Sequence, residues 1–169
     1  MTKIRRWIAI LFIIYILYLI WAVLLKFSFS YSEIPFRRQS VNLDPFYLLR
    51  GSYVSPVIVR EKLMNIFIFI PFGAYLYLLG ARKFPSNFLI IVLTSVLLEI
   101  MQYAFSLGTC DIADIITNAI GGVMGYFLTY ITLRVTNREE RVMKHFTIIS
   151  SVVTPVVIIG TLWLKVKYG

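Results

Sequence analysis

Five apolar runs, each long enough to cross a lipid bilayer, constrain this chain more than any other feature of its sequence. A membrane-spanning helix needs about 20 mostly apolar residues. Within hydrocarbon, only helices and closed barrels satisfy every backbone polar group. The sequence therefore predicts an all-α integral membrane protein, a five-span bundle in one domain over residues 1–169. The expected spans cover about residues 7–25, 63–79, 88–107, 112–133 and 146–164.

Composition and charge support the same interpretation. The chain is 59% hydrophobic, whereas soluble domains are about 45–50% apolar. Its 17 Lys and Arg residues outnumber 8 Asp and Glu residues, which gives a net charge of +9. The basic residues lie between the apolar runs, where anionic lipid headgroups and topology signals explain them. We therefore expect membrane lipids as partners and no nucleic acid.

A polar segment of about residues 26–62 separates the first two runs and is predicted to form a long outer loop. Loops of this length in compact proteins are often functional. Residues 40–46 carry an Asx/Pro turn signature. Arg37, Arg38 and Arg50 are the loop residues that we expect to contact an anion, such as a phosphate.

The basic residues also suggest an orientation. Lys3, Arg5 and Arg6 precede the first run, whose length exceeds the roughly 7–15 residues of a signal-peptide core. We interpret this run as an uncleaved anchor with the N-terminus in the cytoplasm, because cytoplasmic segments are enriched in Lys and Arg. The long loop and the start of the fourth span then lie on the outer face.

Carboxylates and amides interrupt the third and fourth runs. A charged Asp at a membrane helix centre costs roughly 2.5–3.5 kcal/mol on insertion scales, so a cluster of such residues indicates a polar site. Glu99 and Gln102 share a helix face through their i, i+3 spacing, as do Asp111 and Asp114. The candidate ligand-binding residues, all toward the expected outer side, are Asn65, Glu99, Gln102, Asp111, Asp114 and Asn118.

These residue types leave several roles open. The sequence identifies no definite cofactor, but Glu99, Asp111 and Asp114 with neighbouring amides offer the oxygen ligands that Mg²⁺ or Ca²⁺ prefers. Together with basic loop residues they can hold a phosphate, and Glu99 in a low-dielectric site can transfer protons. Alternatively, the polar groups hydrogen-bond one another and specify helix packing.

Small residues and a proline predict how two of the spans meet. Gly121, Gly122 and Gly125 in the fourth run would allow close helix approach. Pro71 in the second run should kink its helix because it lacks a backbone donor. Gly73 lies on the same predicted face as Asn65, so this face is expected to close onto the fourth span.

Four sequence elements, in order along the chain, resemble the VanZ-like family. They are the loop segment at 40–46, N-x-x-x-F-x-P-x-G at 65–73, E-x-x-Q at 99–102 and D-x-x-D-x-x-x-N-x-x-G at 111–121. One departure is Gly108, where many members carry an Arg about three residues before the first Asp. Any phosphate contact would then fall to the loop arginines.

The resemblance implies a multi-pass protein of a bacterial, mostly Gram-positive, cell membrane that reduces susceptibility to teicoplanin-type lipoglycopeptides. The resemblance does not specify whether the protein is an enzyme. Our main hypothesis is an outer-face polar site that binds or remodels a cell-envelope or lipid-anchored molecule, such as the lipoglycopeptide or a lipid-linked cell-wall intermediate. The alternatives are a metal-dependent membrane enzyme acting on a lipid or polyprenyl phosphate, and a small transporter.

Overall fold

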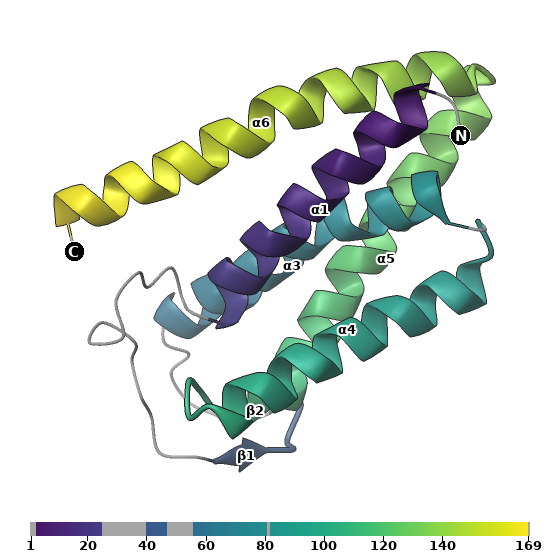
Figure 1. Ribbon diagram of the computed structural model, residues 1–169. Helices are drawn as coiled ribbons and strands as arrows, with labels where there is room; N and C mark the ends of the chain where they lie inside the picture. The colour runs from purple at the N-terminus through teal and green to yellow at the C-terminus, as the bar shows by residue number, and fades with distance from the viewer. Residues whose placement is uncertain (1–2, 25–39, 47–55, 81, 169) are drawn as a thin grey trace.

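The prediction of an all-α membrane protein is confirmed by the computed structural model, which describes residues 3–24, 40–46, 56–80 and 82–168. In these residues, five helices are long and apolar enough to cross a membrane. Two short strands accompany them, β1 (Val41–Asn42) and β2 (Cys110–Asp111). The helices are α1 (Lys3–Leu24), α3 (Pro56–Leu79), α4 (Phe84–Ala104), α5 (Ile112–Thr136) and α6 (Glu139–Tyr168) (Figure 1).

Helices α3 and α5 form the tightest pair in the bundle. A Cβ added at Gly121 would overlap the carbonyl of Ile66, and one at Gly125 would overlap the carbonyl of Ile70. The two helices therefore touch along their backbones, which only glycine permits. Small residues at such contacts are a common basis of helix association in membranes, where lipid tails weaken any hydrophobic driving force.

Two further glycines extend this contact toward the middle of the bundle. A Cβ at Gly73 of α3 would overlap the carbonyl of Gly122 on α5, and Gly122 in turn leaves the space that the Ile91 side chain of α4 fills. Helix α5 is therefore packed closely on both α3 and α4. This packing fixes the positions of the polar side chains that these three helices carry.

The helices extend beyond the apolar cores from which their spans were predicted. Helix α3 begins at Pro56 rather than at residue 63, and α6 begins at Glu139 rather than at residue 146. Proline is favoured in the first helical turn, where its missing N–H is not needed. Because α3 starts early, Lys62 lies inside this helix and not in the preceding loop.

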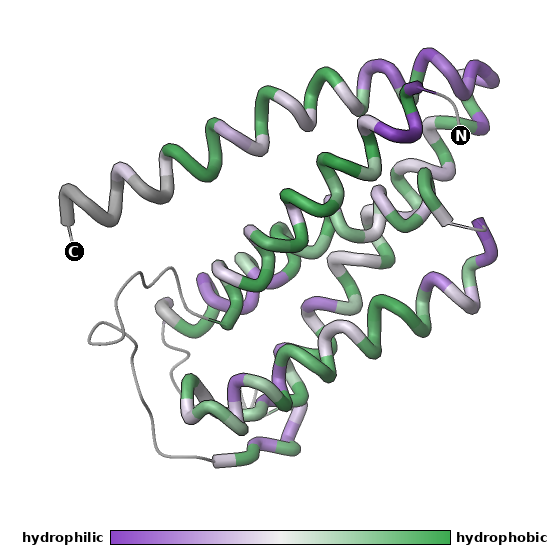
Figure 2. Tube along the Cα trace, viewed as in Figure 1, coloured by the Kyte–Doolittle hydropathy of each residue, from purple (hydrophilic) through white to green (hydrophobic). Residues whose placement is uncertain are grey.

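Hydrophilic residues gather at the two ends of the bundle, and hydrophobic residues lie between them (Figure 2). Many large apolar side chains on the helices are exposed, among them Ile13, Leu17 and Val152. Soluble monomers rarely expose apolar surface on this scale. In this chain the exposed apolar side chains face the hydrocarbon of a bilayer.

One end of the bundle, which we call the basic end, joins α1, the α3–α4 turn and α6. The Arg82 guanidinium donates to both Glu139 oxygens, at 3.1 and 2.5 Å. Arg5 of α1 lies 3.9 Å from the same carboxylate. The Tyr126 hydroxyl donates to the Arg82 carbonyl at 3.0 Å. With Tyr126 of α5 included, these contacts connect four segments that are distant in sequence.

The opposite end, which we call the strand end, carries β1 and β2 (Figure 1). The two strands pair in parallel, with Val41 opposite Cys110 and Asn42 opposite Asp111. This pairing attaches a segment of the predicted outer loop directly to the start of α5. The three loop arginines considered as anion contacts, Arg37, Arg38 and Arg50, lie outside the described residues.

Candidate functional site

A buried lysine connects two carboxylates at the strand end. The Lys62 Nζ atom lies 2.7 Å from an Asp111 oxygen and 2.6 Å from an Asp114 oxygen. Asn65, one turn further along α3, donates to the same Asp114 oxygen at 2.5 Å. Lys62, Asp111 and Asp114 are each at most 8% exposed. We refer to Lys62, Asn65, Glu99, Asp111 and Asp114 as the carboxylate network.

Asp111 is the central residue of the carboxylate network because its backbone and side chain both take part. It is the N-cap of α5, where its carboxylate accepts from the Ala113 N–H at 2.9 Å. Its own N–H donates to Glu99 at 2.9 Å. A short acidic residue is favoured at this position because it satisfies a free N–H and faces the positive end of the helix dipole.

The loop segment contacts the carboxylate network through Asn42. Its side-chain amide donates to Asp111 at 3.3 Å, while its side-chain oxygen accepts from the Asp44 N–H at 3.1 Å. Asp44 then accepts from the Phe46 N–H at 3.0 Å. These are two successive Asx turns, the local structure that the loop sequence indicated. The turns hold the loop strand in the register that brings Asn42 to Asp111.

Two of the six predicted site residues lie apart from the carboxylate network. Gln102 donates to the Val23 carbonyl at 2.8 Å and so ties the end of α1 to α4. Asn118 donates to the Ser95 hydroxyl at 2.9 Å. The Asn118 side-chain oxygen is buried and has no hydrogen-bond partner in the described part of the chain. Both amides therefore act first as links between helices.

The network holds more acidic groups than basic ones. Glu99, Asp111 and Asp114 face the single ammonium of Lys62, and Glu99 is only 1% exposed. Removing an ion from water costs several kcal/mol after relaxation, and a close partner of opposite charge must offset this cost. One lysine can pair closely with two carboxylates, as it does here. Among the residues that the structure describes, three buried carboxyl groups therefore lie near one ammonium within an apolar bundle.

Sequence reasoning missed Lys62 and Asn42 as members of this site. Lys62 precedes Asn65 by three residues, a spacing that places both on one helix face. That signal was hidden because the span was expected to begin at residue 63. Asn42 lies inside the loop segment 40–46, but its pairing with Asp111 depends on strand contacts between distant parts of the chain.

The place between the two aspartates is taken by the lysine. In the described part of the chain, no group of three or more His, Cys, Asp or Glu side chains is arranged to hold a metal ion. The Lys62 ammonium supplies the positive charge between Asp111 and Asp114. Binding of Mg²⁺ or Ca²⁺ here remains a hypothesis that requires Lys62 to move away.

Comparison with known proteins places this architecture in a family. The model of the VanZ/LLP1 family matches residues 12–134, which include every member of the carboxylate network. The chain belongs to the VanZ/LLP1 family. A curated relative, Protein VanZ of Enterococcus faecium, is 33% identical over 129 residues, which cover 75% of this chain and 76% of that protein. No solved structure matches. The family match ends before α6.

Proposed function

We propose that this VanZ/LLP1 family member lowers the susceptibility of its cell to teicoplanin-type lipoglycopeptides. In this proposal the carboxylate network binds or remodels a cell-envelope or lipid-anchored molecule at the outer face of the cell membrane. Membership of the family and the similarity to Protein VanZ support the cellular role. The geometry of the strand end supports the location of the site.

The observation that carries the proposal is the grouping of three buried carboxyl groups, Glu99, Asp111 and Asp114, at one end of the bundle. Helices can be held together by neutral amides at lower cost, as Gln102 and Asn118 do in this bundle. Ionisable residues within membrane segments are expensive and usually functional. Three carboxyl groups gathered around Lys62 favour a ligand group that brings positive charge or hydrogen-bond donors.

The surface beside the carboxylate network suits an amphiphilic ligand. Val41, Leu43 and Phe46 of the loop segment expose large apolar side chains, with Leu43 72% exposed. Asn42, between two of them, is hydrogen-bonded to Asp111. Apolar and polar groups thus alternate where the loop covers the start of α5. This pattern favours a lipid-anchored molecule over a free small ion.

The proposal also includes an orientation. The basic end lies in the cytoplasm and the strand end lies outside, because Lys and Arg are enriched on cytoplasmic segments. Lys3, Arg5 and Arg82 all belong to the basic end. The carboxylate network then faces the side from which a glycopeptide arrives.

Expression in a susceptible Gram-positive host tests this function. We expect the chain to raise the inhibitory concentration of teicoplanin relative to the empty host. Glu99→Gln and Asp111→Asn should lose most of this protection, while Glu140→Gln at the basic end should keep it. If the well-expressed chain gives no protection, the proposal is wrong. The alternative of an enzyme acting on a lipid or polyprenyl phosphate would then be preferred.

A further inference from the structure

A cavity of about 410 Å³ at the basic end lies between the end of α3, the α3–α4 turn, the end of α5 and the start of α6. Two arginines line it, Arg82 and Arg134, together with Tyr77, Tyr130 and Glu139. We propose that this cavity binds the phosphate group of an anionic phospholipid. It lies at the opposite end of the bundle from the carboxylate network, and its occupancy does not depend on the proposed function.

Two tyrosine rings hold the arginines of this cavity in place. The guanidinium carbon of Arg82 lies 5.5 Å from the centre of the Tyr77 ring. That of Arg134 lies 5.4 Å from the centre of the Tyr130 ring. The two rings contact each other edge to face, with their centres 6.2 Å apart. Because a cation is attracted to the face of an aromatic ring, both guanidinium groups are positioned beside the cavity before a ligand arrives.

Among the described residues, Arg134 is the arginine of this cavity that has no acidic partner. Both Glu139 oxygens already accept from Arg82, at 3.1 and 2.5 Å. Arg5 of α1 lies 3.9 Å from the same carboxylate, so Glu139 is fully used. The cavity therefore keeps an excess of positive charge at Arg134. A planar guanidinium matches two oxygens of a phosphate and forms charge-assisted hydrogen bonds with them.

The surroundings of Arg134 favour a lipid over a free phosphate ion. Phe127, Ile131 and Arg134 follow an i, i+4, i+7 spacing, which places them on one side of α5. Phe127 and Ile131 are both exposed, so they face hydrocarbon in a bilayer. A phosphate at Arg134 can therefore continue into acyl chains that lie along this side of α5. Basic pockets between membrane helices are known to bind the headgroups of anionic lipids.

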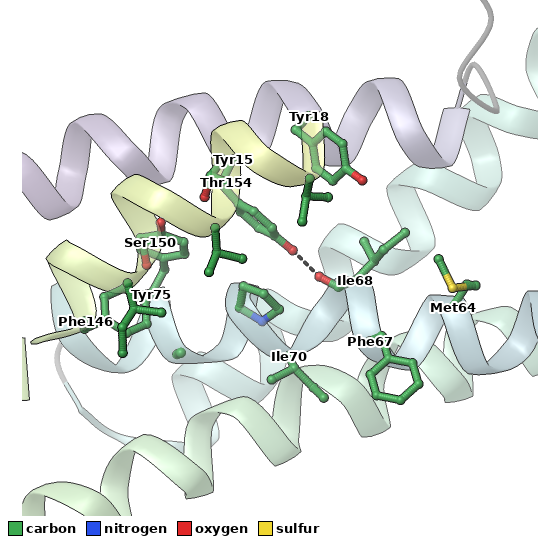
Figure 3. A pocket seen from close by; sticks show the side chains of 15 residues that line it. Tyr15, Tyr18, Met64, Phe67, Ile68, Ile70, Tyr75, Phe146, Ser150 and Thr154 are labelled. Carbon is green, nitrogen blue, oxygen red and sulfur yellow. Dashed lines mark hydrogen bonds between the residues drawn. The ribbon is translucent and has the colours of Figure 1, made fainter. Parts of the chain in front are cut away.

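A second cavity, of about 440 Å³, lies between α1, α3 and α6 and lacks such charge. Figure 3 shows side chains that line it, among them Tyr15, Ile68, Phe146 and Thr154. No Lys, Arg, Asp or Glu belongs to its lining in the described part of the chain. A phosphate there would be a buried charge without a partner, which is strongly disfavoured. This apolar cavity therefore serves as a control site for the basic one.

Native mass spectrometry of the full chain in mild detergent tests the site, with phosphatidylglycerol as the probe. We expect the parent to retain this lipid at concentrations that leave little phosphatidylcholine bound. Arg134→Gln should weaken the binding by about tenfold, a change that corresponds to about 1.4 kcal/mol. Arg138→Gln is the matched control, because Arg138 is exposed at the same end but does not line the cavity. This variant loses the same charge and should bind as the parent does.

Equal weakening by Arg134→Gln and Arg138→Gln would overturn the proposal, because the attraction would then come from the diffuse charge of the basic end. Equal retention of phosphatidylcholine would do the same. Complete displacement of the lipid by inorganic phosphate would assign the cavity to the free ion. Binding that is lost in Thr154→Phe, which narrows the apolar cavity, and kept in Arg134→Gln would place the lipid between α1, α3 and α6 instead.

A measurement on the parent chain decides the matter if Arg134→Gln fails to fold. The chain is irradiated in nanodiscs that contain phosphatidylglycerol with a photoreactive group in its headgroup. Labels on the residues that line the basic cavity are the expected result. Labels confined to other parts of the chain would contradict the proposed site.

Discussion

At the scale of single residues, Lys62 stabilises the strand end by neutralising two buried carboxylates. Its Nζ atom contacts Asp111 and Asp114 at hydrogen-bond distance from a buried position. The lysine is also the residue that sequence reasoning assigned to the loop. The face it shares with Asn65 was readable from spacing, but its ion pairs depend on where α5 begins.

Removing Lys62 alone should destabilise the protein more than removing Lys62 together with one of its carboxylate partners. Lys62→Met removes the ammonium that contacts two buried carboxylates, and breaking a buried ion pair costs about 3–5 kcal/mol. Asp114→Asn added to Lys62→Met should recover part of this loss. Denaturant unfolding in mild detergent of the parent, the two single variants and the double variant measures the coupling free energy between Lys62 and Asp114. Strictly additive effects would mean that the ion pairs contribute little.

The thiol of Cys110 is sensitive to the negative charge of the nearby carboxylates. It is the only cysteine of the chain and lies between α4 and α5. Burial, followed by the charges of Glu99 and Asp111, raises the pKa of its thiol. Because the thiolate is the reactive form, maleimide labelling should need a higher pH than labelling of a free cysteine. Glu99→Gln should move the labelling profile to lower pH, and an unchanged profile would show that Glu99 does not act on this thiol.

At the scale of elements, the α3–α5 contact is defined by glycines. Gly125→Ala should lower stability by about 1–3 kcal/mol, because its Cβ meets the Ile70 carbonyl and the backbones must separate. Gly160→Ala in α6 is the control, since nothing lies within 4 Å of its added Cβ. Alanine is favoured over glycine in helices by about 1 kcal/mol, so this variant should be as stable as the parent or more so. Thermal unfolding that ranks the two variants the other way would contradict the proposed packing.

The elements also show how far sequence reasoning extends. The five helices were predictable because bilayer thickness sets the length of an apolar run. Their ends were not, because Pro56 and Glu139 begin helices in segments that are polar. The pairing of β1 with β2 was not predictable either, since it joins two residues of the loop to two residues far along the chain.

At the scale of the whole molecule, the central expectation is that the strand end faces outward. A membrane-impermeant maleimide applied to intact cells should label Cys110. In a Cys110→Ser background, Glu140→Cys at the basic end should react only after the cells are opened. If Glu140→Cys is labelled in intact cells and Cys110 is not, the orientation is the opposite one and the carboxylate network faces the cytoplasm.

The candidate site was predicted only in part. Asn65, Glu99, Asp111 and Asp114 do lie together at one end of the bundle. The residues that complete the network come from separate elements, Lys62 from an extended helix and Asn42 from a strand. Such contacts depend on tertiary packing, which residue spacing alone does not determine.

We propose that the carboxylate network does more than hold the helices together. The most direct test compares the teicoplanin inhibitory concentration with the amount of folded protein in the membrane, for the parent, Asp114→Asn and Tyr126→Phe. Tyr126→Phe removes a hydrogen bond to the Arg82 carbonyl at the basic end, so its protection should fall in proportion to its folded amount. We predict that Asp114→Asn protects far less per folded molecule than either of the others. If all three give the same protection per folded molecule, the network is a structural element alone and the claim is contradicted.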